Sequence, residues 1–210
     1  MEKKQPIAVA VLGRAPALGR VKRRLAATIG DQQALGVYRW LLARTLEVAT
    51  SSGLPVWFFA TDDQQPEVQQ LGSEYGCRVR GQASGDLGER MRQAFVQVHQ
   101  CSQQVVLVGT DCPVLSASDL WQLAGAVGSG GLAAMAAEDG GYVALASGRA
   151  DIWESANPLA GVDWGTETAL SDTITRLRRY EEKVTICGRK WDLDTEADLA
   201  RARTLGICPV

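Results

Sequence analysis

Short apolar segments alternate with segments of helical periodicity through residues 7–127, and this alternation constrains the fold more than any other feature. Runs of this kind, bounded by turn residues, are typical of buried strands. They lie at residues 7–13, 56–60, 77–81 and 105–108. Apolar residues three or four apart predict helices over 31–51, 67–75, 86–100 and 119–127. Strand and helix in alternation imply right-handed crossovers, which predicts a parallel sheet with helices on both faces.

The expected helix ends rest on local chemistry. Asp31 and Ser118 are the expected N-caps of the first and last of these helices, because short polar side chains accept hydrogen bonds from free backbone N–H groups. Gly53, shortly before Pro55, is the expected end of the helix over 31–51.

The pattern changes after residue 131. Residues 132–137 and 142–146 are apolar and flank Glu138-Asp139-Gly140-Gly141, which predicts an antiparallel pair joined by a turn. A helix over 166–180, a strand over 184–187 and a closing helix over 195–205 complete the expected elements. Because residues 1–210 contain no repeat or linker, we expect one mixed α/β domain.

Charge and cysteine content exclude several classes of protein. Lys and Arg total 22 against 24 Asp and Glu, and this balance gives no support to a broad nucleic-acid interface. The five cysteines are scattered and show no C-x-x-C spacing, which is typical of reduced thiols in a cytoplasmic protein. No segment approaches the roughly 20 apolar residues that span a bilayer. We therefore expect a cytoplasmic protein that binds neither nucleic acid nor membrane.

Asp111 is the first candidate for a functional side chain. It follows the buried strand at 105–108, and ligands of open α/β sheets collect outside the carboxyl ends of the strands. The alternative is that Asp111 only caps a turn, for which Asp-x-Pro is suitable chemistry.

A glycine-bearing basic loop follows the first strand. Residues 13–25 match neither a Walker A loop nor the dinucleotide fingerprint. Glycines let backbone amides approach phosphate oxygens, and Arg and Lys neutralise their charge. The loop carries five cations: Arg14, Arg20, Lys22, Arg23 and Arg24. It predicts a phosphate site, with a solvated basic face as the alternative.

Two further groups of residues suggest ligand contacts. Residues 85–91 enter a helix, and helix N-termini favour anions, so Arg90 in the first turn is placed to reach a nucleotide or phosphate. The alternative is a capped helix start in which Glu89 and Arg90 face water. Asp111 and Asp194 offer the carboxylates that Mg²⁺ prefers, although Asp194 is also placed to cap the closing helix. His99 and Cys112 are interpreted as structural, because neither has a catalytic partner nearby in sequence.

These motifs share their order with a known family. The stretches are Ala15-Pro16, Gly19, Lys22, Arg24-Leu25, Gly85-Asp86-Leu87-Gly88-Glu89-Arg90-Met91, Gly109-Thr110-Asp111-Cys112-Pro113, Glu138-Asp139-Gly140-Gly141-Tyr142, Trp164-Gly165-Thr166, Asp192-Leu193-Asp194-Thr195 and Asp198-Leu199. Taken together they resemble the bacterial DUF2064 proteins, described as glycosyltransferase A-like or rSAM/selenodomain-associated transferases. The resemblance implies a nucleotide-diphospho-sugar transferase fold: a Rossmann-like three-layer α/β/α sandwich with one antiparallel strand. More distantly, the chain is similar to phospholactate guanylyltransferases and sugar nucleotidyltransferases.

The sequence departs from that family pattern in places. Arg23 stands where Thr is usual, Val114 where an acidic residue is common, and Met135-Ala136 where Gly-Pro usually stands. These departures bear on the identity of the acceptor more than on nucleotide binding.

The residues and the resemblance together predict an Mg²⁺- or Mn²⁺-dependent transferase that joins a nucleotide to a small phosphorylated or sugar-like acceptor. Lys22, Arg24 and Asp111 would be catalytic, and Asp111 and Asp194 would hold the metal. The remaining nucleotide contacts would come from Gly13, Arg14, Gly19, Gly88 and Arg90, and the acceptor contacts from Glu138, Asp139, Tyr142 and Trp164. The alternatives are a glycosyltransferase that uses a nucleoside-diphosphate sugar, and a non-catalytic nucleotide-binding regulator.

Overall fold

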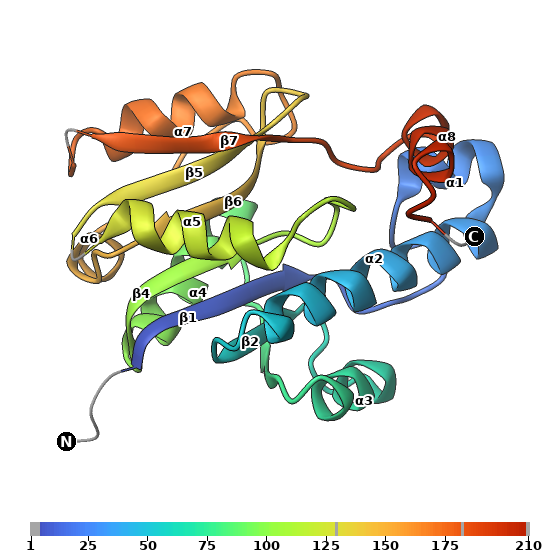
Figure 1. Cartoon of the computed structure of the whole chain (residues 1–210), viewed down its shortest axis with the longest axis horizontal. Coiled ribbons are helices and arrows are strands. Elements are labelled where there is room, and N and C mark those ends of the chain that lie inside the picture. Colours follow the sequence, from blue (N-terminus) through green and yellow to red (C-terminus); the bar gives the residue numbers. More distant parts are fainter. Residues whose placement is uncertain (1–4, 129, 182, 209–210) are drawn as a thin grey trace.

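A seven-stranded sheet forms the centre of the protein in the computed structural model, which describes residues 5–128, 130–181 and 183–208 (Figure 1). The strand order is β3-β2-β1-β4-β6-β5-β7. Strand β6 runs antiparallel to β4 and β5, and the other pairs are parallel. The strands are β1 Gln5–Gly13, β2 Val56–Ala60, β3 Arg78–Gly81, β4 Ser102–Val108, β5 Leu132–Ala137, β6 Tyr142–Ser147 and β7 Val184–Lys190. The mostly parallel sheet with one antiparallel strand is confirmed.

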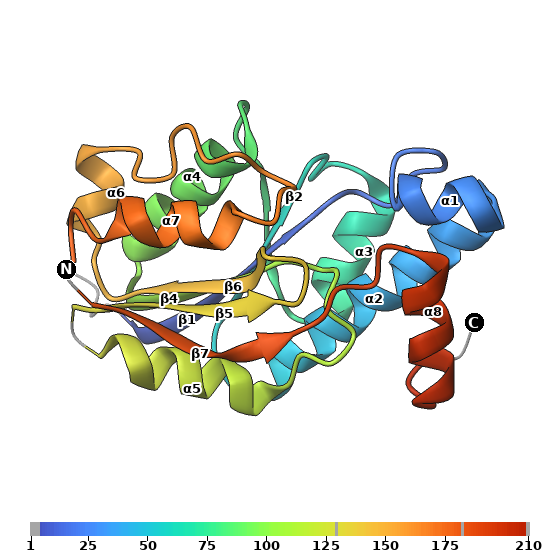
Figure 2. The same ribbon diagram turned by 90° about the horizontal axis from the view of Figure 1, so that it is seen from above.

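Helices cover both faces of this sheet, as Figure 2 shows. The helices are α1 Arg23–Ile29, α2 Asp31–Ser51, α3 Pro66–Glu74, α4 Leu87–His99, α5 Ala117–Val127, α6 Asp151–Ser155, α7 Ala169–Leu177 and α8 Glu196–Thr204. Alternate residues of β1 pack on opposite faces: Val9 and Val11 lie in the core with α2, α3 and α5, while Ala8 and Ala10 lie in the core with α4, α6 and α7. The three-layer α/β/α architecture is therefore confirmed.

A third, smaller core lies beyond the carboxyl end of β1, where α1 and α8 pack beside α2 (Figures 1 and 2). Leu25 of α1 and Leu41 of α2 are fully buried in it, together with Trp191 and Leu193 from the segment after β7. Two segments far apart in sequence, the basic loop and the end of β7, are thus brought to the same end of the sheet.

Some expected helix ends are wrong, and each has a local cause. Ser116 rather than Ser118 caps α5, because only Ser116 has Asp119 three helical positions on, and the two residues form a capping box. Asp31 is the first residue of α2 and Gly30 its N-cap. The helix expected over 166–180 spans only Ala169–Leu177, and this leaves residues 164–166 in a loop. Helices α1 and α6 were not predicted.

The residues that we expected to be structural are packed inside. His99 is 1% exposed and stacks on Phe95. Cys112 is buried, and burial raises the pKa of its thiol to about 12, which keeps it protonated and unreactive. All five cysteines are described, and none forms a disulfide.

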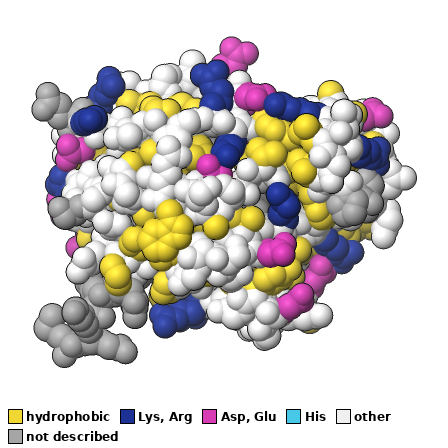
Figure 3. Space-filling model, in the orientation of Figure 1, with side chains coloured by type: hydrophobic (Ala, Val, Ile, Leu, Met, Phe, Trp, Pro, Cys, Tyr) yellow, Lys and Arg dark blue, Asp and Glu magenta, His cyan; other side chains and the backbone are white. Residues whose placement is uncertain are grey.

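On the face that Figure 3 shows, Lys and Arg side chains are interspersed with Asp and Glu side chains rather than gathered in one patch. In the part of the chain that the structure describes, no helix is both long and apolar enough to cross a membrane.

Candidate active site

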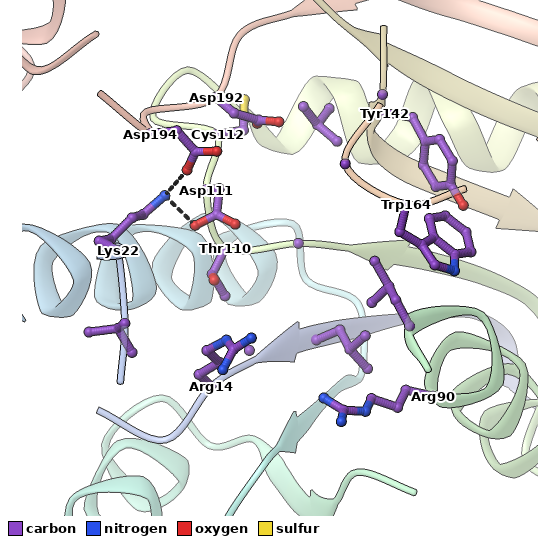
Figure 4. A pocket seen from close by; sticks show the side chains of 18 of the residues that line it. Arg14, Lys22, Arg90, Thr110, Asp111, Cys112, Tyr142, Trp164, Asp192 and Asp194 are labelled. Atoms are coloured by element: carbon purple, nitrogen blue, oxygen red, sulfur yellow. Dashed lines mark hydrogen bonds and ion pairs between the residues drawn. The ribbon is translucent and has the colours of Figure 1, made fainter. Parts of the chain in front are cut away.

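A cavity of about 650 Å³ opens beyond the carboxyl ends of β1 and β4, within the size range of small-molecule sites. Its walls come from the loops after β1 and β4, the start of α4, the turn between β5 and β6, and residues 164–166 and 192–194. Figure 4 shows charged side chains around Lys22 and Asp111 at one end and the aromatic rings of Tyr142 and Trp164 at the other. The cavity therefore has a charged end and an aromatic end.

The loop after β1 is held rigidly at the cavity wall. The hydroxyl of Tyr38, a buried residue of α2, accepts a hydrogen bond from the Arg14 backbone N–H and donates one to the Arg14 carbonyl, both at 2.7 Å. Gly13 allows this close approach, because a Cβ there would lie 2.9 Å from Thr110 and 3.3 Å from the Tyr38 hydroxyl. The Arg14 side chain consequently starts from a fixed backbone.

Lys22 lies at the charged end, enclosed by oxygen atoms. Its Nζ is 2.5 Å from Asp111 Oδ1, 2.9 Å from Asp194 Oδ1 and 2.6 Å from the Leu193 carbonyl oxygen (Figure 4). Burial alone would lower the pKa of Lys22, but the charges of Asp111 and Asp194 outweigh it and raise the pKa above its usual value. The ammonium therefore stays protonated. It ties the basic loop to the loops that carry Asp111 and Asp194, which lie more than 80 residues apart in sequence.

Asp111 is thus more than a turn cap. Its carboxylate pairs with Lys22, and its backbone carbonyl accepts a hydrogen bond of 2.9 Å from the Leu193 N–H. Asp194 does not cap α8, because Thr195 does so in a capping box with Asp198. Both carboxylates are therefore available to the cavity, with about 48% and 41% of their side chains exposed.

Residues 191–194 present their two aspartates by simple alternation. Trp191 and Leu193 are buried in the core of α1, α2 and α8, while Asp192 and Asp194 line the cavity. Burial, with Asp111 next in importance, raises the pKa of Asp192 to about 7. The Asp192 carboxyl therefore changes charge near neutral pH.

Asp192 carries a testable pH dependence. Its folded pKa lies above the usual value of 3.8, so ionisation costs the folded state stability progressively between about pH 4 and pH 7. We expect Asp192→Asn to be more stable than the wild type at pH 8 by a few kcal/mol, with an advantage that shrinks toward pH 5. Urea unfolding in EDTA at both pH values measures this. An equal change at both values would contradict the assignment, and Asp62→Asn, at an exposed aspartate, is the control.

The aromatic end rests on the turn between β5 and β6 and on residues 164–166. The rings of Tyr142 and Trp164 pack edge to face, with their centroids 6.2 Å apart. The buried indole N–H of Trp164 finds no hydrogen-bond acceptor among the described residues. Leu87 and Met91 of α4 complete this end of the wall. It offers an apolar surface to the cavity.

The entry to α4 places Arg90 at the cavity. Asp86 caps the helix by accepting a hydrogen bond from the Glu89 N–H. Arg90 lines the cavity, with its Nε donating to the Gly85 carbonyl. Glu89 does not face water alone: it pairs with Arg92, which lowers its pKa to about 2.

Most of the predicted site residues share this cavity. Those in its lining are Gly13, Arg14, Lys22, Arg24, Arg90, Asp111, Asp139, Tyr142, Trp164 and Asp194. Gly19, Gly88 and Glu138 lie outside it. Gly88 packs α4 closely against Leu159, and Glu138 is turned outward into an ion pair of 2.7 Å with Arg201 of α8. Gly19 is an exposed turn residue with a φ of 70°.

Sequence reasoning gave no role to some residues in the wall. Asp192 could have been assigned to the cavity, because Trp191 to Asp194 alternate apolar and acidic residues. Gln82 had no signal: it lies just after β3, and its side chain donates to the Gly13 carbonyl at 2.5 Å and the Phe59 carbonyl at 2.9 Å. Its position depends on strand order, which the sequence does not specify.

The donor set at the charged end suits a hard divalent cation. Mg²⁺ is usually bound by one or two carboxylates, with water and substrate phosphate as its other ligands. Asp111 and Asp194 already direct one oxygen each toward a single positive charge, that of Lys22. Among the described residues no group of three or more His, Cys, Asp or Glu side chains is arranged as a metal site. The convergence of the Asp111 and Asp194 carboxylates on one point is the feature that fits such a cation.

Comparison with known proteins identifies the family and the fold. The family model of DUF2064, described as an uncharacterized protein conserved in bacteria, matches residues 44–166, more than half of the chain. A search of curated proteins finds no match. A provisionally assigned nucleotide-diphospho-sugar transferase from Desulfovibrio desulfuricans G20 superposes with a TM-score of 0.83 at 22% identity, covering 95% of this chain and 87% of that one.

Two other solved structures share the fold at lower similarity. A CMP:2-keto-3-deoxy-manno-octonic acid synthetase complexed with CTP has a TM-score of 0.59 at 16% identity, covering 96% of this chain and 98% of that one. Rv0371c from Mycobacterium tuberculosis H37Rv, in complex with manganese, has a TM-score of 0.59 at 20% identity. The match covers 94% of this chain and 97% of that one. At these identities the likeness shows the fold, which is that of nucleotidyltransferases and GT-A-like enzymes.

Proposed function

The chain belongs to the DUF2064 family, and we propose that it is a divalent-cation-dependent nucleotidyltransferase. It would join the nucleotide of a nucleoside triphosphate to a small phosphorylated or sugar-like acceptor and release pyrophosphate. The observation that carries this proposal is the meeting of the basic loop with Asp111 and Asp194 at one end of a cavity whose other end is aromatic.

The charge of the cavity supports a polyanionic ligand. Its lining contains four aspartates and six cations, although the whole chain has a net charge of -2. The cations are Arg14, Arg20, Lys22, Arg23, Arg24 and Arg90. A triphosphate needs more of this positive charge than the diphosphate of a sugar donor does. The cation excess therefore favours nucleotidyl transfer.

The proposed chemistry follows from these residues. An acceptor oxygen forms a bond to the α-phosphorus, the bond between that phosphorus and the α–β bridging oxygen breaks, and pyrophosphate leaves. Arg14 and Arg24 bind the phosphates and stabilise the charge that develops on the departing pyrophosphate. Asp111 and Asp194 would hold the divalent cation, which supplies charge neutralisation on the phosphate oxygens. An acceptor phosphate is already ionised at neutral pH and needs no general base, whereas a sugar-like hydroxyl would release its proton to solvent as the bond to phosphorus forms.

The aromatic end would receive the acceptor. Tyr142 and Trp164 both line the cavity and present apolar ring surface to an acceptor. Asp139 lies at the same turn and lines the cavity. Glu138, which the resemblance assigned to the acceptor, is excluded from this proposal because it pairs with Arg201.

A second candidate is glycosyl transfer from a nucleoside-diphosphate sugar. The likeness to the Desulfovibrio protein, at a TM-score of 0.83, favours it, and the aromatic wall would suit a sugar ring. The two candidates differ in the donor: one binds a triphosphate and releases pyrophosphate, while the other binds a diphosphate sugar and releases a nucleoside diphosphate.

A thermal-shift panel with Mg²⁺ separates these candidates. A ligand that binds only the folded state raises the midpoint by mass action, by roughly 5–10 °C at about 100 times its Kd. We expect such a rise with one nucleoside triphosphate, and its loss in EDTA. A rise in the unfolding midpoint with nucleoside-diphosphate sugars alone would favour glycosyl transfer, the second candidate. Binding that is independent of metal and leads to no turnover would indicate a regulator.

A further inference from the structure

The ammonium of Lys22 occupies the same oxygen cage that a divalent cation would use. We call the three oxygens around it, Asp111 Oδ1, Asp194 Oδ1 and the Leu193 carbonyl oxygen, the Lys22 cage. An ammonium has three N–H donors, and these three oxygens are enough to use them all. The Lys22 side chain is only 3% exposed. In this state Lys22 has no donor left for a phosphate.

We propose that the Lys22 ammonium occupies the metal position while no metal is bound. The divalent cation displaces the ammonium from the cage, and the released ammonium then binds the phosphates of the nucleotide. This inference rests on the proposed function for the identity of the anion. It deepens that function, because it makes cation binding and nucleotide binding depend on each other.

Charge balance explains the dependence. Two carboxylates and one ammonium leave the cage with a net charge of -1, and a divalent cation in place of the ammonium makes it neutral. A cation without nucleotide would leave Lys22 without an anionic partner at this end of the cavity. A nucleotide without cation would take Lys22 away and leave Asp111 and Asp194 repelling each other. Only the two ligands together pair every charge, so each should raise the affinity of the other by the same factor.

The backbone at Lys22 is consistent with a position set by its side chain. Lys22 has a φ of 47° and a ψ of 47°, and among the described residues it is the only one other than glycine with a positive φ. This left-handed conformation is unfavourable outside glycine and persists where the surroundings enforce it. Lys22 also precedes α1, and its carbonyl accepts the Ala26 N–H at 2.8 Å. The start of α1 at the backbone and the cage at the side chain thus both hold Lys22 in place.

The test measures Mn²⁺ affinity by calorimetry in the absence of any nucleotide. The wild type should bind Mn²⁺ weakly, because the cation must first displace a charged, hydrogen-bonded ammonium. Lys22→Met should bind it about 10- to 100-fold more tightly, the range expected when such a hydrogen bond no longer has to be broken. Asp111→Asn introduced into Lys22→Met should abolish the gain.

Arg24→Met is the matched control, since it removes a positive charge beside the same carboxylate without vacating the cage. Its Nη1 is 3.8 Å from Asp194 Oδ2, and its side chain is 70% exposed. We expect it to raise the Mn²⁺ affinity only about 2-fold, as for an exposed ion pair. An equal gain in both variants, or no gain in Lys22→Met, would overturn the exchange.

A measurement on the wild type keeps the proposal testable should Lys22→Met fold poorly. Acetylation followed by mass spectrometry should find Lys22 protected without metal and reactive at saturating Mg²⁺ without nucleotide, while exposed Lys183 reacts equally in both. Unchanged protection of Lys22 would contradict the exchange. Neither test uses turnover, so the exchange can fail while nucleotidyl transfer stands, and the reverse.

Discussion

Replacement of Asp111 by asparagine is expected to lower Mg²⁺-dependent pyrophosphate release by about 10³-fold. Asparagine keeps the size of the side chain, but it removes one of the two carboxylates that would neutralise the cation. Electrostatic groups of this kind contribute about 2.7–4 kcal/mol to catalysis when a single one is deleted. The loss should persist at saturating nucleotide, because it concerns charge that develops in the transition state. Initial rates of pyrophosphate release with and without EDTA measure it.

Asp62→Asn is the control for this prediction. Asp62 also lies just beyond the carboxyl end of a neighbouring strand, β2, but it is exposed and outside the cavity lining. Its carboxylate accepts a hydrogen bond of 3.2 Å from the Gln64 N–H. The Asp62 variant should keep the wild-type rate. A folded Asp111→Asn variant with a similar rate would show that Asp111 does not hold the catalytic cation.

Gly140→Ala is expected to lower the free energy of unfolding by about 2–5 kcal/mol. Gly140 has a φ of 91°, and a Cβ there would lie 2.2 Å from the Glu167 carbonyl oxygen. The same glycine accepts a backbone hydrogen bond of 3.0 Å from Leu170, so the turn and the segment after Trp164 cannot move apart freely. The left-handed backbone costs roughly 1–2 kcal/mol for alanine, and overpacking adds typically 1–3 kcal/mol. Equilibrium unfolding in urea measures the sum.

Gly53→Ala separates the two contributions. Gly53 has a φ of 75° at the end of α2, and a Cβ there would meet nothing within 4 Å. It should cost only about 1–2 kcal/mol, the backbone share alone. Equal destabilisation by the two substitutions would contradict the close packing of the turn on Glu167.

The sequence predicted elements well where the apolar periodicity ends at a turn residue such as glycine or proline. Helix α2 has the expected bounds of Asp31–Ser51, because a long amphipathic stretch ends before Gly53 and Pro55. Strand β2 also has its expected bounds, Val56–Ala60. Helix α1 was missed because it shows no apolar face in the sequence: four of its seven residues are exposed and only Leu25 is buried. Its stability comes from the core it shares with α2 and α8, which no local pattern reveals.

The site was predicted in its parts but not in its assembly. Position at a strand end was enough to single out Asp111. The contact of Asp111 and Asp194 with Lys22 depends on the order of strands in the sheet, since these residues lie far apart in sequence. For the same reason the sequence assigned Glu138 to the acceptor, although it pairs with Arg201 of α8, 63 residues away.

The most direct test of nucleotidyl transfer follows the α-phosphate. The wild-type protein is incubated with Mg²⁺, each of the four nucleoside triphosphates labelled at the α- or the γ-phosphate, and the deproteinised small-molecule fraction of bacterial cells. We predict that, with one triphosphate, the α-label moves into a new compound while the γ-label appears in pyrophosphate. Neither product should form in EDTA. Release of a nucleoside diphosphate from an added diphosphate sugar, with all four triphosphates intact, would contradict nucleotidyl transfer.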